Sequence, residues 1–241
     1  MLIFTKSFRS IFFFTTLFLF FFAYQSTAQD FYKSTNFEKY YAANDSVKAF
    51  TTEENSVVFM GNSITEAWPI LSPDFFKDHQ YIGRGISGQT SYQMLFRFRR
   101  EVIDLQPKVV VLLAGTNDIA QNTGYTPIDI IAENVMTMVE LAQYHNIEVI
   151  ICSVLPAIDF PWRRGLQPAE KIVALNNLLQ DYATENGITY VDYHAAMKDK
   201  HNGLKVPEFT TANDLVHPNK EGYKVMEELI QPAIKRALGK K

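Results

Sequence analysis

Polar residues that could perform nucleophilic chemistry recur along this chain, each directly after a short apolar run. Ser63 stands in the segment Gly61–Thr65, which follows the run from Val57 to Met60. Its backbone N–H would lie near the N-terminus of a following helix, where negative charge is favoured, and this suits a nucleophile and its oxyanion. A serine in such a turn often only caps the helix, so this segment alone leaves both roles open.

Two further segments offer groups that can donate hydrogen bonds to a developing negative charge. Gly85 lies in a glycine-rich segment where the backbone can approach a ligand closely, although a flexible turn explains the glycines equally well. Asn117 follows another apolar run and carries a directed amide donor, although asparagine is also common in turns. Its neighbour Asp118 could hold the loop or cap a turn.

The glycines at 83, 85 and 88 also spell the dinucleotide-binding pattern G-x-G-x-x-G. That pattern belongs after the first strand of its fold, with an acidic residue about 20 positions further on at the end of a strand. This segment follows the second apolar run and has no such acidic residue. We therefore expect no dinucleotide site here.

Asp214 and His217 could supply the acid–base pair that a serine nucleophile requires. An Asp three residues before a His on a turn can reach the second imidazole nitrogen and orient the ring. A rival pair, Asp192 and His194, also follows an apolar run, but nothing upstream matches it to Ser63. The other three histidines lack metal-ligand spacing and no cysteine cluster exists, so we expect no metal or other cofactor.

The elements that must position these residues follow an alternating pattern from residue 56 onward. Short β-branched runs alternate with longer segments of helical period, which is typical of βα units around a parallel sheet. The expected strands are Val57 to Met60, Gln80 to Ile82, Val109 to Leu113, Val149 to Val154 and Ile188 to Val191. Ligands of open parallel sheets bind beyond the carboxyl ends of the strands, and the polar segments all lie there.

Proline marks the expected helices. Thr126 and Pro127 predict a cap residue followed by a proline at the first helical position. Pro168 predicts the start of a second helix, which ends before the next glycine. The last helix is expected over Glu221 to Leu238, and Pro232 should kink or divide it because proline lacks a backbone donor.

The N-terminal residues differ in composition from everything after them. Lys6 and Arg9 precede an apolar run from Ile11 to Tyr24, and small residues follow as far as Ala28. This pattern predicts a secretory signal peptide over residues 1–28, cleaved after its last residue, and an exported mature chain. An uncleaved membrane anchor is the alternative, but the run is shorter than the roughly 20 residues that a span needs.

The remaining chain is predicted to be an N-terminal arm or helix over residues 29–55, packed on a single domain over 56–241. Without the leader, 21 Lys and Arg stand against 26 Asp and Glu, a formal charge of −5. This balance argues against a nucleic-acid partner, because phosphate binding needs a concentrated basic surface. Cys152 is the only cysteine, and its place in an apolar run predicts a buried side chain.

Together the motifs resemble the four blocks of the SGNH hydrolases, also called the GDSL lipase and esterase family. The blocks are Gly61–Thr65, Gly85, Gly115–Asp118 and Asp214–Pro218, and they occur in the order of the family. The resemblance implies an α/β fold, a three-layer α/β/α sandwich with a five-stranded parallel sheet of flavodoxin-like order.

The resemblance also implies a role for each matching residue. Ser63 is the expected nucleophile, His217 its base and Asp214 the partner that orients the base. The expected oxyanion donors are the backbone N–H groups of Ser63 and Gly85 and the side chain of Asn117. Such a site hydrolyses an ester through an acyl-enzyme.

This chain departs from the usual Gly-Asp-Ser of the family by having Asn62, which is assigned no catalytic role. Subfamilies that resemble platelet-activating-factor acetylhydrolase and bacterial carbohydrate acetylesterases show this kind of variation, and Trp68 fits them too. The expected partner is therefore a small-molecule or carbohydrate ester with a short acyl group. Lysophospholipid or thioester hydrolysis is the alternative within the enzyme class, and a flavodoxin-like module that binds without turnover is the alternative outside it.

A loop after the fourth predicted strand should overhang the site. Trp162 could stack on a sugar ring or an acyl chain, and Arg163 with its neighbour Arg164 could meet an acidic group. An ordinary exposed loop would have the same composition.

Overall fold

The computed structural model describes residues 33–50 and 56–239 of the 241-residue chain. The described residues divide between two compact units, the first ending at Lys39 and the second beginning at Tyr40. In the first, the described residues begin with a short helical turn and reverse at Asn36, whose N–H donates to the carbonyl of Lys33 at 3.1 Å. The predicted signal peptide lies outside the described residues. Within those residues, every helix is too short or too polar to cross a membrane.

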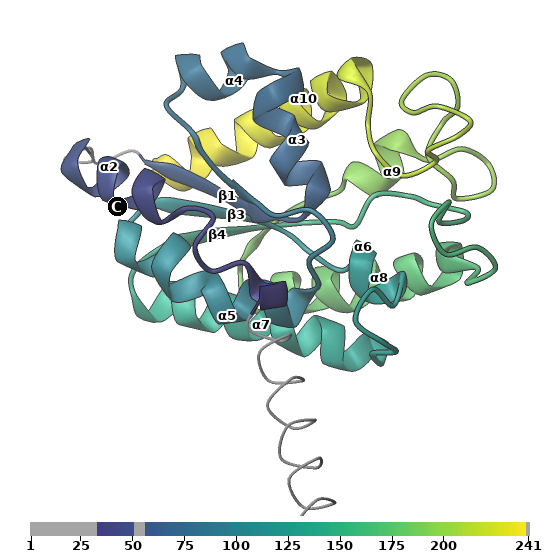
Figure 1. Ribbon diagram of the computed structural model, residues 1–241, viewed down its shortest axis with the longest axis horizontal. Helices are drawn as coiled ribbons and strands as arrows, with labels where there is room; N and C mark the ends of the chain where they lie inside the picture. Colours follow the sequence, from purple (N-terminus) through teal and green to yellow (C-terminus); the bar gives the residue numbers. More distant parts are fainter. Residues whose placement is uncertain (1–32, 51–55, 240–241) are drawn as a thin grey trace, which may run out of the picture. The chain divides into compact units, whose positions relative to one another are not determined.

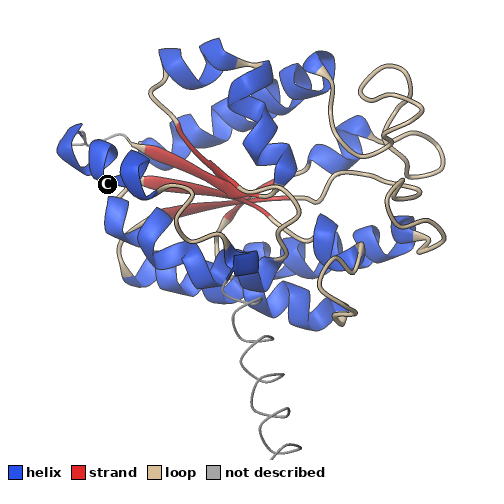
Figure 2. Cartoon of the chain, viewed as in Figure 1, coloured by secondary structure: helices blue, strands red, loops and turns tan. Residues whose placement is uncertain are grey.

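Five parallel strands form one sheet in the second unit, in the order β2-β1-β3-β4-β5 (Figures 1 and 2). The strands are β1 Val57–Gly61, β2 Ile82–Gly85, β3 Val109–Leu113, β4 Glu148–Cys152 and β5 Thr189–Val191. This confirms the predicted flavodoxin-like sheet. The strand order reverses beside β1, because β2 pairs on one side of it and β3 on the other. In open α/β sheets that reversal is where ligands bind.

Helices cover both faces of this sheet and make the predicted three layers. Figure 1 shows α3, α4 and α10 on one face and α5, α7 and α8 on the other. The helices are α2 Tyr41–Phe50, α3 Ser63–Leu71, α4 Pro73–Asp78, α5 Ser91–Glu101, α6 Thr116–Ile119, α7 Ile128–Tyr144, α8 Pro168–Glu185, α9 Tyr193–Met197 and α10 Lys220–Leu238, with a 3₁₀ turn at Ile103–Leu105.

The side chains of β1 alternate between two apolar clusters, one on each face of the sheet. Val57 and Phe59 pack in the cluster that includes α3 and α10, and Val58 and Met60 pack in the cluster of α5, α7 and α8. All four are at most 1% exposed. Burial of each such side chain contributes roughly 1.5–3 kcal/mol, so the strand that leads to Ser63 is firmly held.

Two strands differ from the predicted bounds by two residues or more at one or both ends, and specific hydrogen bonds give the reason. β2 begins at Ile82 because Gln80 adopts a left-handed conformation, φ 55°, and Tyr81 N–H donates to the carbonyl of Phe76 at the end of α4. β4 ends at Cys152, short of the predicted Val154. The backbone N–H and C=O of Val154 pair instead with the side chain of Asn176, at 2.8 and 3.0 Å.

The prediction at Pro168 is confirmed, the one at Pro127 is wrong by one position, and the predicted division of the last helix at Pro232 is wrong. Pro168 opens α8 at its first position, as expected. Pro127 is the residue before α7 and not its first helical residue. Pro232 does not divide α10, which runs unbroken through it. The flanking Ile230 and Ala233 are fully buried, and this packing outweighs the loss of one backbone donor.

Part of the predicted N-terminal arm forms α2, which contacts the sheet edge and α5. The Tyr40 hydroxyl, just before α2, donates to the Gly85 carbonyl at 2.5 Å, and burial raises the pKa of Tyr40 to about 12. The Asn44 amide donates to the Arg100 carbonyl at 3.3 Å. The Tyr40 bond reaches the end of β2, where one of the predicted oxyanion donors lies, and the Asn44 bond reaches α5.

Candidate active site

Ser63 is the first residue of α3, directly beyond the carboxyl end of β1. Asn62 caps this helix, because its side-chain oxygen accepts a hydrogen bond from Ile64 N–H at 3.0 Å. The capping role that the sequence left open for Ser63 is therefore filled by its neighbour. The Ser63 hydroxyl lies 2.9 Å from Nε2 of His217, a residue 154 positions further along the chain.

Glycine allows the first turn of α3 to lie directly on the ends of β1 and β2. A Cβ atom at Gly61 would lie 2.0 Å from the Thr65 hydroxyl oxygen, and one at Gly85 would lie 2.1 Å from the backbone N of Glu66. Real Cβ atoms do not approach that closely. The Glu66 carboxylate also accepts the Ser87 N–H at 2.5 Å, which holds the loop after β2 against α3.

Asp214 and His217 form the second half of a hydrogen-bonded chain. The Asp214 carboxylate lies 2.8 and 3.1 Å from Nδ1 of His217 and also accepts the backbone N–H groups of Val216 and His217. An imidazole whose Nδ1–H donates to a carboxylate keeps Nε2 as an acceptor for the Ser63 hydroxyl. Both side chains stay about one-third exposed, at 33% for His217 and 37% for Asp214.

Asn117 lies in α6, beyond the end of β3, and is almost fully buried. Its side-chain amide donates one hydrogen bond to the Gln89 carbonyl at 2.9 Å. A primary amide carries two N–H bonds, so a second donor is available for a ligand. The chain from Gly85 to Gln89 and the α6 turn therefore meet through this side chain.

Asp118 anchors the same turn to α5, as the sequence suggested it could. Its carboxylate accepts the Ser91 backbone N–H at 2.9 Å and the Ser91 hydroxyl at 2.6 Å. Burial raises the pKa of Asp118 to about 6, although the hydrogen bonds from Ser91 act in the opposite direction. The turn that carries Asn117 thus depends on a buried carboxyl group.

Trp162 lies beside His217, whereas Arg163 bonds to a different part of the chain. The indole ring of Trp162 is 46% exposed, and its centroid lies 6.1 Å from that of the His217 ring. Its N–H donates to the side-chain oxygen of Asn122 at 3.1 Å. The Arg163 guanidinium donates to the carbonyl of Gln121, so it holds the loop to the α6 region.

The rival pair Asp192 and His194 is not joined by a hydrogen bond in the described part of the chain. Asp192 caps α9 by accepting the Ala195 N–H at 2.9 Å. His194 is buried, its Nε2 has no hydrogen-bond partner among the described residues, and burial lowers the pKa of its imidazole. Within residues 33–50 and 56–239, neither Asp192 nor His194 forms a hydrogen bond with Ser63.

Two further residues of the site were missed by the sequence reasoning. Arg97 of α5 is fully buried, and its guanidinium donates to the Gly61 carbonyl at the end of β1. The Asn122 side chain joins the loop after β2 to Trp162, because its amide donates to the Gly88 carbonyl at 3.1 Å and its oxygen accepts the indole N–H. An arginine in a charged helix end and an asparagine before a glycine-containing turn carry no local signal for these roles.

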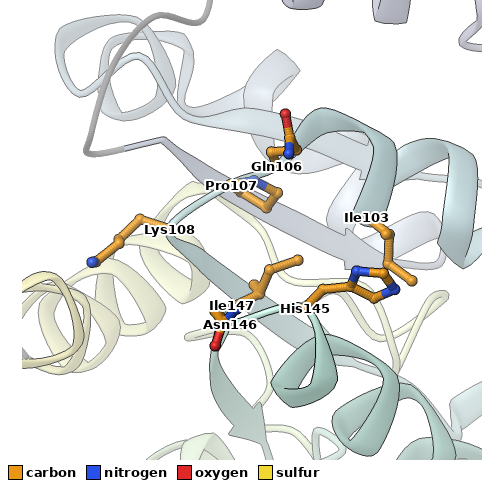
Figure 3. Close-up of a pocket in the computed structure, with 7 residues that line it drawn as sticks. All are labelled: Ile103, Gln106, Pro107, Lys108, His145, Asn146 and Ile147. Carbon is orange, nitrogen blue, oxygen red and sulfur yellow. The ribbon is translucent and has the colours of Figure 1, made fainter.

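A hollow of about 220 Å³ lies at the other end of the sheet and takes no part in this arrangement. Figure 3 shows Lys108, His145 and Asn146 among the residues around it. They adjoin the amino ends of β3 and β4, whereas Ser63 follows the carboxyl end of β1. Among the residues 33–50 and 56–239, no group of three His, Cys, Asp or Glu side chains is arranged to hold a metal ion.

Known proteins resemble this chain in sequence and in fold. The model of the GDSL-like lipase/acylhydrolase family matches residues 59–225. The crystal structure of a GDSL-like lipase from Bacteroides thetaiotaomicron is 48% identical, with a TM-score of 0.80 over 84% of this chain and 98% of that one. An acetyl xylan esterase, 23% identical with a TM-score of 0.60 over 74% of this chain and 98% of that one, shares the fold.

A curated relative matches over a shorter segment. It is an uncharacterised lipoprotein of Bacillus subtilis, 32% identical over 81 residues, which are 32% of this chain. The chain spans about a third of the length of this relative, 33% of it.

The buried carboxyl group of Asp118 predicts a pH-dependent stability. Its pKa is about 6 in the folded protein against an ordinary 3.8, so the folded state binds the proton more tightly. The contribution of this group to the free energy of unfolding is therefore largest below about pH 4 and declines as the pH rises to 6 and above. Asp118→Asn lacks the group, so the stability of wild type relative to this variant should fall across that interval.

Urea unfolding at pH 4, 5, 6 and 7 measures this difference directly. Ser91→Ala is the matched control, because it removes one donor to the carboxylate but keeps the titrating group. That variant should shift the interval to higher pH. A constant difference between wild type and Asp118→Asn would contradict the prediction.

Proposed function

Since this chain belongs to the GDSL-like lipase/acylhydrolase family and is a carboxylic ester hydrolase, we propose that Ser63 is its nucleophile. The hydrogen-bonded chain from Ser63 through His217 to Asp214, with links of 2.9 and 2.8 Å, is the observation that carries this proposal. A base within that distance can remove the hydroxyl proton as the oxygen attacks. A module that binds without turnover has no need for such a chain.

The proposed reaction has two steps that share one base. His217 takes the Ser63 proton while the oxygen attacks the ester carbonyl, and Asp214 stabilises the imidazolium that forms. The imidazolium then protonates the departing alcohol, which leaves an acyl group on Ser63. Water attacks this acyl-enzyme with His217 again as the base, and the acid is released.

The proposed oxyanion donors come from three different strand ends. Ser63 N–H lies in the first turn of α3, where backbone N–H groups lack acceptors within the helix. Ile86 N–H donates to the Gly61 carbonyl across the β1–β2 ladder, and alternation along a strand turns the preceding Gly85 N–H away from that ladder. The second N–H of the Asn117 amide completes the set.

Export and a short-chain carbohydrate ester are the proposed setting and substrate. The leader pattern of residues 1–28 supports export. The negative formal charge of the mature chain argues against a nucleic-acid partner. The exposed Trp162 ring beside His217 is a surface on which a sugar could stack. The acetyl xylan esterase of the same fold supports an acetyl group on a sugar. Lysophospholipid or thioester hydrolysis is the second candidate.

Removal of the nucleophile tests the chemistry. Ser63→Ala should reduce hydrolysis of p-nitrophenyl acetate to the background rate, because no acyl-enzyme can form. Ser72→Ala, at the opposite end of α3, is the matched control and should keep the wild-type rate. Activity of Ser63→Ala equal to wild type would remove this serine from the mechanism.

Truncation of the side-chain donor tests the oxyanion site. Asn117→Ala should lower kcat by about 10²–10³-fold, the usual effect of losing one oxyanion donor, while the protein stays folded. Circular dichroism and the thermal midpoint report on folding, and steady-state kinetics on p-nitrophenyl acetate report on kcat. An unchanged kcat in a folded variant would assign the oxyanion to other donors.

The Trp162 ring tests the substrate class. Trp162→Ala should lower kcat/KM for an acetylated xylooligosaccharide by about 3–10-fold, the range expected when one aromatic contact is lost. Hydrolysis of p-nitrophenyl acetate should change less than twofold, since that ester is too small to span the loop. Trp162→Phe keeps a stacking ring and is the control. Higher wild-type activity on long acyl chains than on acetylated sugars would favour the lipid alternative.

A further inference from the structure

Arg97 is a fully buried charged residue that the proposed chemistry does not use. It lies in α5, with a side chain at 0% exposure. Its guanidinium forms an ion pair with Glu101 one turn further along the helix. Burial lowers the pKa of Arg97, and the nearby carboxylate of Glu101 acts in the opposite direction. A buried ion pair rarely stabilises a fold more than apolar side chains of equal volume would, so this pair calls for another explanation.

The remaining donors of Arg97 reach three acceptors on separate segments of the chain. They bond to the Gly61 carbonyl at 2.8 Å, the Arg84 carbonyl at 2.9 Å and the Gln89 side-chain oxygen at 2.5 Å. Only the planar, five-donor guanidinium can meet so many acceptors in fixed directions. The side chain therefore connects the ends of β1 and β2 with the loop that follows β2.

Each of these acceptors adjoins one of the proposed oxyanion donors. The Arg84 carbonyl belongs to the same peptide group as Gly85 N–H. The Gly61 carbonyl lies in the peptide that leads into the turn of Ser63. The main-chain carbonyl of Gln89 accepts the Asn117 amide at 2.9 Å.

The positive charge of Arg97 acts on the proposed oxyanion donors in two ways. A carbonyl that accepts a hydrogen bond from a guanidinium is polarised, and the N–H of the same peptide becomes a stronger donor. The bonds also hold the donors in place before the reaction, so no reorganisation is needed when the oxyanion forms. Both effects favour the tetrahedral intermediate over the bound ester and change kcat more than KM.

We infer that Arg97 is a positioning residue of the oxyanion site, which fixes and polarises the Gly85 peptide and aligns the Ser63 turn and Asn117. The inference rests on the proposed function, because it assigns a support to donors that the ester reaction uses. Arg97 itself does not contact the substrate.

Arg97→Lys is the decisive variant, because it keeps the charge beside Glu101 but cannot reach all three acceptors. We expect kcat for p-nitrophenyl acetate to fall by about 10–100-fold, with KM within about threefold. The inhibition constant of ethylboronic acid, which adds to a serine hydroxyl as a tetrahedral anion, should rise by a similar factor. Arg99→Lys, on the exposed side of the same helix, is the matched control and should match wild type.

A purely structural role predicts a different result. Arg97→Lys would then lose thermal stability but keep the wild-type kcat per folded molecule and the wild-type boronate inhibition, and that outcome would overturn the inference. The proposed function fails separately, if Ser63→Ala retains the wild-type rate.

Gln89→Met provides a second route if Arg97→Lys does not fold. It replaces the Gln89 side-chain amide, whose oxygen accepts the Arg97 Nε–H, with a thioether side chain of similar length. We expect kcat to fall by about 3–10-fold and the boronate inhibition constant to rise in parallel, as for a partial loss of donor alignment. Unchanged values for both quantities in the folded variant would overturn the inference.

Discussion

The first turn of α3 lies in direct contact with the ends of β1 and β2, and the geometry of the proposed site depends on this contact. Gly61 and Gly85 permit it, because a methyl group at either position would meet α3 at about 2 Å. The contact places Ser63 at the N-terminus of a helix and directly beside the end of an edge strand. The groups that come from elsewhere, Asn117 and His217, must then reach the same point from the loops after β3 and before α10. The reversal of strand order beside β1 leaves room for them to do so.

The two halves of the site are built in different ways. The oxyanion half, which holds the proposed oxyanion donors, is embedded in the core, where Asn117 is 3% exposed and its supporting groups are buried too. The base half, which holds the proposed base, is a turn that largely organises itself, because the Asp214 carboxylate accepts two backbone N–H groups of its own turn as well as the imidazole. The buried side chains of Val216 and Pro218 attach that turn to the domain. Substitutions of the buried groups that support the oxyanion half should therefore affect both folding and chemistry, whereas the sequence around the short motif of the base half can vary.

Much of the fold and the polar clusters of the site could be predicted from the sequence, because both depend on local patterns. β3 was predicted to the residue, and the four motif blocks lie where the sheet brings them together. Two of the errors arose where hydrogen bonds between residues far apart in the sequence decide the structure. Val154 pairs with Asn176, 22 positions away, which ends β4 earlier than its apolar run suggests. Arg97 belongs to an arginine-rich helix end that looks like a solvated surface, and its partner Gly61 lies 36 positions away. No local pattern encodes such a pairing.

Helix α5 contributes no group to the proposed chemistry, yet it connects the parts of the oxyanion half. Its first residue, Ser91, donates to the buried Asp118, and one face of the same helix carries Arg97. An anion therefore accepts bonds at the start of the helix, and a cation donates bonds from its second turn. The buried Asp118 carboxylate of the α6 turn accepts its bonds from Ser91 of α5, whereas Arg97 of α5 pairs with Glu101 and donates to carbonyl groups at the ends of β1 and β2. Because unpaired buried charges are costly, separation of α5 from the α6 turn or from the strand ends would leave a buried charge without some of its partners. That coupling explains how donors from three strand ends stay aligned around a partly exposed serine.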